Sequence, residues 1–243
     1  MKSNKNGRKG LMAEIMSALY GGKQSTENAP HTEGITIRWG RFYDVVVWLF
    51  FTGKERIVRK QTLELALIRP GDKVLDVGCC TGTLTIAARE KSDTDGEVHG
   101  IDSSPEMIDA ASKKALRIGT DVKFQVALIE AIPFPDGYFD VVLSSLMIHH
   151  LPGDALKQKA FFEMRRVLRP GGRILIVDFE PPTGPLSSRI ASLIIGHDMM
   201  KSNVKAMYPM TKKALYTEIS SGGTKSKIIS FISGIAGDRN GLY

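Results

Sequence analysis

Residues 74–82 have the sequence VLDVGCCTG, in which a short apolar strand runs into a loop that contains two glycines. A helical pattern of apolar residues begins at Thr83, directly after this loop. A strand, a glycine-bearing turn and a helix in this order let a ligand approach the backbone at the carboxyl edge of a parallel sheet. Because nucleotide-binding proteins of many kinds contain such a loop, it predicts a cofactor site without naming the cofactor.

The chain around this loop alternates between predicted strands and helices. Strands are expected at 73–77, 98–101, 122–126, 141–146 and 173–179, and helices at 54–68, 83–90, 104–118 and 155–168. Further along, 210–220 is expected to be helical, and 226–232 and 235–242 to form a closing strand pair. Continuous apolar strands separated by helices favour an α/β fold with a doubly wound, mostly parallel seven-stranded sheet, Rossmann-like and covered on both faces.

The 243 residues are expected to form one domain behind a basic N-terminal segment. The segment 1–30 is polar and glycine-bearing, so we expect it to be mobile. The remaining chain, 31–243, divides into a helical lid, a cofactor-binding core and a substrate-side segment with the closing strands, at 31–70, 71–180 and 181–243 respectively.

The overall composition is ordinary for a globular protein, with 42% hydrophobic and 24% charged residues. The only two cysteines, Cys79 and Cys80, are adjacent, which suits neither a disulfide nor a metal site. We therefore expect no bound metal and a reducing, cytoplasmic location. The longest apolar run, at 45–51, is far shorter than the roughly 20 residues of a membrane-spanning helix.

Positive charge is concentrated at the two ends of the chain, although the net charge is only +7. Residues 1–10 hold four basic and no acidic groups, and residues 181–243 hold eight basic and three acidic groups. This asymmetry favours an anionic partner, such as a phosphate-bearing small molecule, an acidic membrane surface in peripheral contact, or nucleic acid. A solvated surface with no partner explains the pattern equally well.

Two aspartates narrow the choice of cofactor. Asp102 ends the second predicted strand, at the position from which a carboxylate accepts hydrogen bonds from ribose hydroxyls. Asp76 is expected at the mouth of the first strand, where its charge would repel a pyrophosphate at close range. S-adenosylmethionine (SAM) carries an ammonium and a sulfonium and no phosphate, so it suits Asp76 better than NAD does. The alternative is that either aspartate only caps the following helix.

Four segments together resemble the successive motifs of the class I SAM-dependent methyltransferases. They lie at 76–82, 100–107, 132–140 and 165–172. The resemblance covers roughly residues 40–180 and is strongest to the branch that contains the ubiquinone/menaquinone-biosynthesis C-methyltransferases and their small-molecule and phospholipid relatives. It implies a methyltransferase that uses SAM as its cofactor.

The resemblance also implies roles for individual residues. It places the loop against the methionine and ribose of SAM, Asp102 on both ribose hydroxyls, and further residues at the adenine or methionine end. The implied cofactor-binding residues are Asp76, Gly78, Cys79, Cys80, Gly82, Asp102, Ser103, Leu128, Ile129 and Ser144. Two positions depart from the family pattern. Cys80 stands where glycine is usual, so we expect its backbone to avoid positive φ angles, and Leu128 stands where an acid often pairs with the adenine amino group.

Candidate catalytic residues are His149 and Tyr43. His149 and its neighbour His150 follow the fourth strand, and a histidine can act as a base at neutral pH. Tyr43 lies in the lid, where packing is the more frequent role of an aromatic. The expected acceptor is a small or lipid-like molecule, such as a quinone precursor or a phospholipid amine. Nucleic acid is a minor candidate, since the run after the fourth strand, 144–147, is not the Asp/Asn-Pro-Pro-aromatic box of amino-methylating nucleic-acid enzymes.

Two other functions compete with methyl transfer, namely a SAM-binding protein without catalysis and an NAD-linked oxidoreductase. The sequence leaves open whether carbon, nitrogen or oxygen is methylated, and which oligomer forms.

Overall fold

The computed structural model describes residues 55–180, 184, 203–226 and 228–238. The basic segment 1–30, most of the predicted lid with Tyr43, and part of the predicted substrate-side segment lie outside these residues. The division into one domain with a lid and a substrate-side segment therefore stays a prediction.

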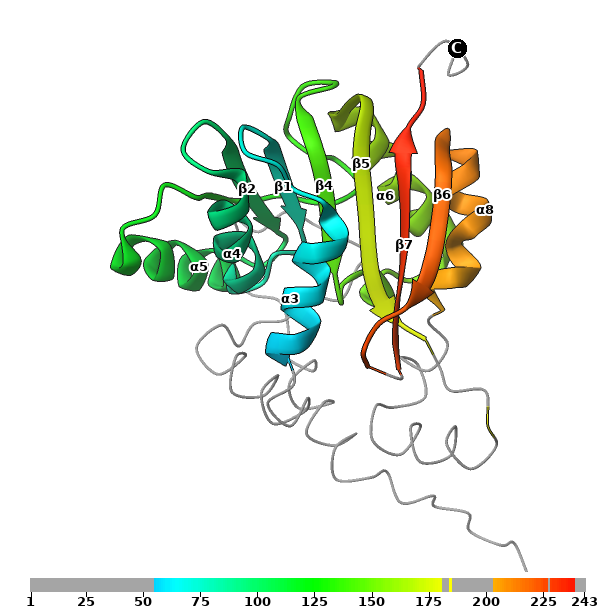
Figure 1. The fold of residues 1–243 in the computed structure, drawn as a ribbon, viewed down its shortest axis with the longest axis horizontal. Coiled ribbons are helices and arrows are strands. Elements are labelled where there is room, and N and C mark those ends of the chain that lie inside the picture. Colours follow the sequence, from blue (N-terminus) through cyan, green and yellow to red (C-terminus); the bar gives the residue numbers. More distant parts are fainter. Residues whose placement is uncertain (1–54, 181–183, 185–202, 227, 239–243) are drawn as a thin grey trace, which may run out of the picture.

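The described residues form a seven-stranded sheet in the order β3-β2-β1-β4-β5-β7-β6 (Figure 1). Its strands are β1 (Lys73–Val77), β2 (Glu97–Asp102), β3 (Lys123–Val126), β4 (Phe139–Ser145), β5 (Leu168–Phe179), β6 (Tyr216–Gly223) and β7 (Ile229–Ala236). The first five strands pair in parallel, and β7 runs antiparallel to both of its neighbours. The predicted doubly wound, mostly parallel seven-stranded sheet is confirmed.

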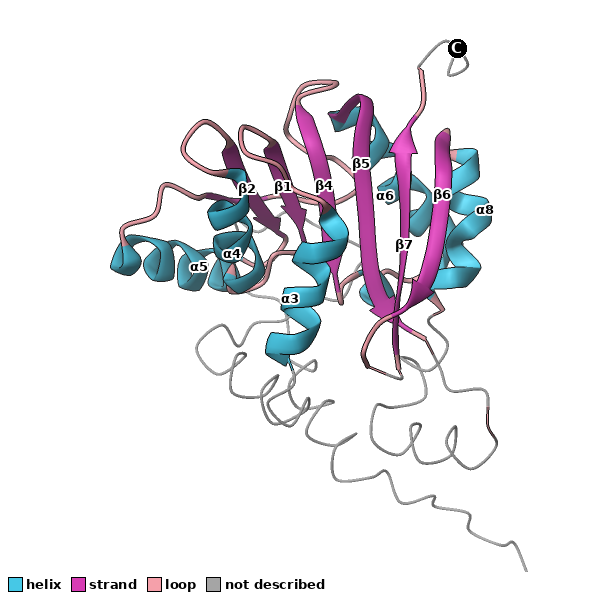
Figure 2. Cartoon of the chain, viewed as in Figure 1, coloured by secondary structure: helices cyan, strands magenta, loops and turns pink. Residues whose placement is uncertain are grey.

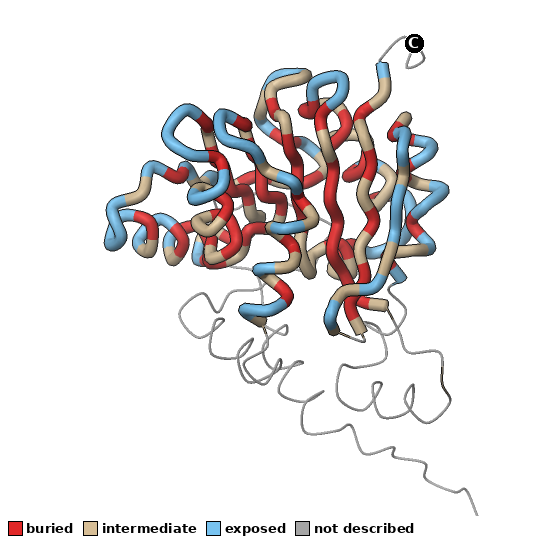
Figure 3. The backbone as a smooth tube through the Cα atoms, in the orientation of Figure 1, coloured by how far each residue is buried: buried red, intermediate tan, exposed pale blue. Residues whose placement is uncertain are grey.

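Helices cover both faces of this sheet (Figure 2). They are α3 (Glu55–Ala66), α4 (Thr83–Ser92), α5 (Pro105–Ile118), α6 (Gly153–Val167) and α8 (Tyr208–Lys213), with short 3₁₀ helices η1 (Ile148–His150) and η3 (Val204–Met207). Successive residues of a strand point to opposite faces, so Val74 packs with α3 and α4 while Leu75 packs with α6. Both residues have no exposed surface, and the buried interior follows the central strands (Figure 3). This double cover explains why these strands are apolar without alternation.

Helix α5 begins where the sequence predicts. The hydroxyl of Ser104 accepts a hydrogen bond from the Met107 N–H at 3.3 Å, and Pro105 is the first helical residue. The helix ends at Gly119, whose positive φ of 70° suits glycine. These local signals place Asp102 and Ser103 in the short connection between β2 and α5.

The C-terminal part of the chain differs from the prediction. The helix expected at 210–220 is wrong, because α8 ends at Lys213 and β6 begins at Tyr216. The closing strand pair is β6 with β7, and not 226–232 with 235–242. Strand β7 inserts between β5 and β6, so its pairing with β5 along seven residues decides the register. That long-range pairing leaves no local signal in the sequence.

A smaller difference concerns residues 169–172, which lie between the helix predicted at 155–168 and the strand predicted at 173–179. They form the beginning of β5, which starts directly after α6 and pairs irregularly with β4 between Phe139 and Val141. No helix in the described part of the chain is long and apolar enough to cross a membrane.

Candidate active site

A cavity opens at the carboxyl edge of the sheet, where the strand order reverses between β1 and β4. Ligands of open α/β sheets bind at this kind of switch point. Four adjacent strand ends contribute to the cavity wall. In the spatial order β4, β1, β2 and β3, the lining residues include Leu146, Met147, His150, Val77, Gly78, Cys80, Asp102, Ser103, Leu128, Ile129 and Glu130.

The glycine loop presents bare backbone to this cavity. A Cβ atom on Gly78 would lie 2.2 Å from Cγ of Met147, and the φ angle of Gly78 is +75°. A Cβ atom on Gly82 would lie 2.5 Å from Cζ of Phe124, although Gly82 itself is not among the lining residues. Both positions therefore exclude any larger residue, for reasons of space as well as conformation.

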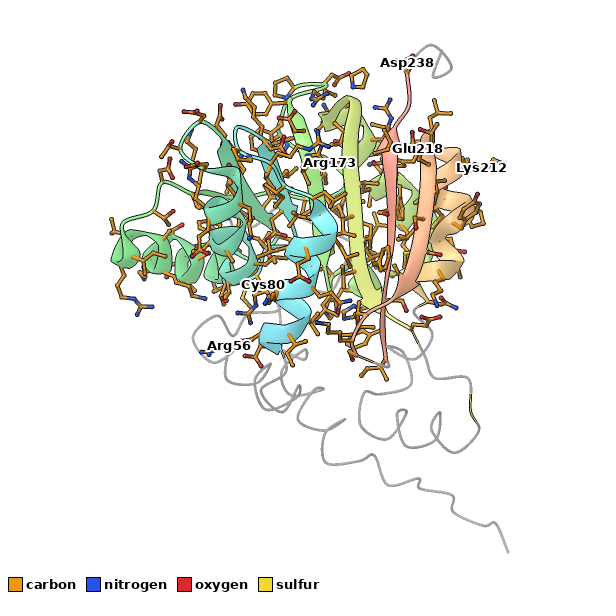
Figure 4. The ribbon with its side chains drawn as sticks, viewed as in Figure 1. Arg56, Cys80, Arg173, Lys212, Glu218 and Asp238 are labelled. Carbon is orange, nitrogen blue, oxygen red and sulfur yellow. The ribbon has the colours of Figure 1, made fainter. Side chains whose placement is uncertain are left out.

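Cys80 corrects one prediction about the loop. Its φ angle is +49°, in the left-handed region that the sequence argument expected a side chain to avoid. Cys80 adopts the left-handed backbone conformation that is usual for glycine. A hydrogen bond stabilises it, in which the Cys80 N–H donates to Oδ2 of Asp102 at 3.0 Å. Cys80 lines the cavity at the carboxyl edge, whereas Arg173 binds Asp72 towards the opposite edge (Figure 4).

Asp102 lies in the cavity wall at the end of β2, as predicted. Its Oδ1 atom accepts the Ser104 N–H at 2.9 Å, and its Oδ2 atom accepts the Cys80 N–H. Burial raises the pKa of Asp102, and these N–H donors oppose that rise. The carboxylate is thus held in place by backbone on both sides, and its contact with a ribose stays a prediction.

Asp76 does not stand where the sequence argument placed it. It is 1% exposed and points to the α4 face of the sheet, where its Oδ2 atom accepts the Thr85 hydroxyl at 2.6 Å. Burial raises the pKa of Asp76 to about 7. Asp76 is thus not among the residues that line the cavity, and its predicted effect on the choice of cofactor stays a prediction.

Two other predicted cofactor residues also lie behind the cavity wall. Cys79 is 6% exposed, and burial raises the pKa of its thiol well above the usual range. Ser144 is 1% exposed, and its hydroxyl has no hydrogen-bond partner among the residues that the structure describes. Neither is among the residues that line the cavity, whereas Ser103, Leu128 and Ile129 are.

The structure places the two histidines differently from the prediction. His150 lines the cavity, while the side chain of His149 is only 3% exposed and lies behind it. Nδ1 of His149 is 2.7 Å from Oδ1 of Asp178, and the His149 N–H donates to Oδ2 of Asp178 at 3.0 Å. The centroids of the two imidazole rings are 4.0 Å apart. His150, and not the predicted His149, is therefore the histidine that can contact a molecule bound in the cavity.

The sequence argument missed Asp178, Met147 and Glu130 as parts of the site. Asp178 is the single acid in the apolar strand segment 174–179, and a lone carboxylate in a buried strand is itself a signal of function. Met147 has no such signal, because its position over Gly78 depends on how η1 folds back after β4. Glu130 follows Leu128 and Ile129 and lies with them in the cavity wall.

Residues 74–172, which contain all of these cavity residues, match the model of a methyltransferase domain family. The chain is 33% identical over 163 residues to the ubiquinone/menaquinone biosynthesis C-methyltransferase UbiE of Burkholderia ambifaria, covering 67% of this chain and 66% of that protein. This chain belongs to the class I SAM-dependent methyltransferases. The cofactor of this methyltransferase is accordingly SAM, as predicted.

Solved structures agree on the fold of the methyltransferase. A SAM-dependent methyltransferase from Aquifex aeolicus superposes with a TM-score of 0.62 at 20% identity, covering 79% of this chain and 97% of that one. Phosphoethanolamine N-methyltransferase 2 of Haemonchus contortus, in complex with SAM, gives 0.63 at 16% identity and covers 97% and 75%. At these identities the similarity establishes the fold, and it does not identify the methyl acceptor of this chain.

The cavity of the methyltransferase fits SAM on its own chemistry. The carboxylate of Asp102 offers acceptors for hydroxyl groups, and Gly78 contributes backbone without a side chain to the wall, packed against Met147. None of the described lining residues is lysine or arginine, the residues that hold a pyrophosphate most strongly. A phosphate-free cationic nucleoside therefore suits this wall.

Proposed function

We propose that this methyltransferase transfers the methyl group of SAM to a carbon atom of a small hydroxylated ring, of the kind from which quinones are built. The observation that carries the proposal is the 33% identity to a quinone-biosynthesis C-methyltransferase across the segment that builds the cavity. The chain spans 66% of that relative's length, so the acceptor itself is inferred.

The binding of SAM is assigned to residues along the sheet edge. Asp102 and Ser103 at the end of β2 would hold the ribose, with Leu128 and Ile129 on the β3 side against the adenine. Gly78, whose backbone lines the cavity next to Met147, would contact the methionine portion. When bound, SAM supplies an electrophilic methyl group on a sulfonium.

The chain's part in the transfer is to position the acceptor, exclude water and receive a proton. Methyl transfer to a ring carbon forms a C–C bond, returns the S–CH₃ electron pair to sulfur and releases one proton from the ring or its hydroxyl. His150 is a side chain on the β4 side of the wall that can accept a hydrogen bond from that hydroxyl. It lies on the β4 side, next to Met147 and opposite the adenine end.

Two features of the wall disfavour an acceptor that carries a phosphate. The lining residues within the described ranges provide no lysine or arginine, and burial lowers the pKa of His150 to about 3, so that this histidine is neutral at pH 7. A phosphoethanolamine or phospholipid headgroup would meet no cation on this wall. A neutral hydroxylated ring needs none.

The test is methyl transfer from SAM with a ¹³C-labelled methyl group to a panel of acceptors. The panel contains a hydroxylated quinone precursor that lacks the ring methyl group, phosphoethanolamine, and phosphatidylethanolamine in vesicles. We expect label on a ring carbon, detected by mass spectrometry and NMR, and none on the two amines. Label on an amine nitrogen would overturn the proposed acceptor.

Binding measurements separate this outcome from a protein without catalysis. Calorimetry with S-adenosylhomocysteine (SAH) is expected to show binding, and NAD none. Binding of SAH with no product from any acceptor would favour the SAM-binding protein without catalysis. Binding of NAD in place of SAH would contradict the function altogether.

A further inference from the structure

Asp178 occupies an unusual place for a carboxylate. It lies near the end of β5 with no exposed surface, and three N–H groups surround it. Its Oδ1 atom is 2.7 Å from both the Phe179 N–H nitrogen and Nδ1 of His149, and its Oδ2 atom accepts the His149 N–H at 3.0 Å. A buried charge is costly unless it is paired and hydrogen-bonded, so this arrangement keeps Asp178 ionised.

The contact with Asp178 fixes one side of the His149 ring. An ionised carboxylate only accepts hydrogen bonds, so Nδ1 of His149 must carry the hydrogen. The ring then has one orientation, with its Nδ1–H towards Asp178 and Phe179 packed edge-on at a centroid distance of 4.9 Å. Burial alone would raise the pKa of Asp178, but the attraction of His149 and these N–H donors lower it below its usual value.

His149 in turn lies against the histidine that faces the cavity. The ring centroids of His149 and His150 are 4.0 Å apart with an interplanar angle of 43°. The backbone of both residues is part of η1, and the His150 N–H donates to the Met147 carbonyl at 2.9 Å. A ring anchored from behind at Asp178 therefore limits how the His150 ring can rotate.

We propose that Asp178 is a positioning residue that acts through His149 on His150, holding the His150 ring so that it accepts a hydrogen bond from a hydroxyl group of the methyl acceptor. Asp178 and His149 touch neither cofactor nor acceptor in this scheme; only His150 does. The proposal deepens the proposed function, since it assigns the hydroxylated acceptor to one ring of the cavity wall.

The protonation state of His150 also suits it to accept a hydrogen bond. The pKa of His150 is lowered first by burial and then by the neighbouring His149, while Asp178 opposes the shift. A neutral imidazole keeps an acceptor nitrogen for a hydroxyl hydrogen, which an imidazolium lacks. An acceptor hydroxyl polarised in this way gains electron density at the neighbouring ring carbon, where the new C–C bond forms.

Two variants test the chain of contacts from opposite ends. Asp178→Asn keeps the size of the side chain, but either orientation of its amide turns an NH₂ group towards a hydrogen that Asp178 now accepts. His149→Asn places an amide nitrogen where Nδ1 stands and so keeps the bond to Asp178, while it removes the ring that lies against His150. The matched control is Asp140→Asn at the amino edge of β4, where the carboxylate accepts the Lys73 N–H at 2.8 Å.

The first measurement needs no turnover. Long-range ¹H–¹⁵N spectra of histidine-labelled protein report the tautomer of each ring, with His149→Gln and His150→Gln used for assignment. We expect Nδ1–H on His149 in the wild type and changed His150 signals in both Asp178→Asn and His149→Asn. Unchanged His150 signals in both variants would overturn the proposal, even if the chain proved to bind no SAH.

The second measurement uses the acceptor that turns over. We expect kcat to fall at least about tenfold in both variants, the scale of a misplaced acid–base group, while the Kd for SAH stays within about twofold. Asp140→Asn should leave kcat near the wild-type value. If kcat and SAH affinity fell together in Asp178→Asn, as for a general loss of structure, Asp178 would be a structural residue and the proposal would be wrong.

Discussion

The backbone N–H of Cys80 donates to the carboxylate of Asp102 at 3.0 Å, which joins the glycine loop after β1 to the end of β2. The two residues are 22 positions apart in the sequence. Because the same carboxylate also lines the cavity, it shapes the loop and faces the cofactor at once. A change at Asp102 therefore acts on binding through two routes.

We predict that Asp102→Ala weakens SAH binding at least about a hundredfold. Hydrogen bonds to a charged group contribute roughly 1.5–3 kcal/mol each, and the loop also loses its anchor. Calorimetry with SAH measures the effect. The matched control is Asp109→Ala on α5, whose exposed carboxylate pairs only with Lys113 among the described residues. Wild-type affinity in Asp102→Ala would contradict its place in the cofactor site.

The positive φ angle of Cys80 predicts an unusual effect of glycine at two neighbouring positions. Cys80→Gly should stabilise the fold by up to about 1 kcal/mol, because a side chain in the left-handed region costs roughly 1–2 kcal/mol. Glycine also loses more conformational entropy on folding, and this loss cancels part of the gain. Cys79→Gly should destabilise it, since Cys79 is buried and its φ is not positive. Urea unfolding of both variants checks the pair, and equal losses would refute the strain at Cys80.

The free energy of unfolding of Asp76→Asn, relative to that of the wild type, should increase as the pH rises from 4 to 8. Burial raises the pKa of Asp76 from 3.8 to about 7, so the folded state favours the protonated form. The stability that this provides is complete below pH 3.8 and is lost as the pH rises through 7. Each pKa unit corresponds to roughly 1.4 kcal/mol, so the variant's advantage should reach a few kcal/mol.

Urea unfolding at a series of pH values measures this difference between Asp76→Asn and the wild type. Asp109→Asn, on the exposed face of α5, serves as the control and should show no such trend. A constant difference between pH 4 and 8 would mean that Asp76 titrates normally in the folded state.

Local patterns in the sequence were sufficient for most of the parallel sheet. The strand at 73–77, the cap at Ser104 and the helix stop at Gly119 depend on contacts within a few residues, and the structure has them at those places. The C-terminal strands were misplaced because the pairing of β7 with β5 joins residues 50 to 62 positions apart, from Phe179 with Ile229 to Arg173 with Ile235. No short-range pattern records which strand inserts at that edge.

The same distinction applies to the site. By itself the sequence determined which strand ends meet at the cofactor edge, since parallel strands joined by helices bring their carboxyl ends together, and Asp102 followed from that. Only the tertiary structure decided which way each side chain points. Asp76 turns to α4 because alternate residues of a strand face opposite sides of the sheet, and His150 reaches the cavity because Asp178, from a distant strand, holds His149 behind it.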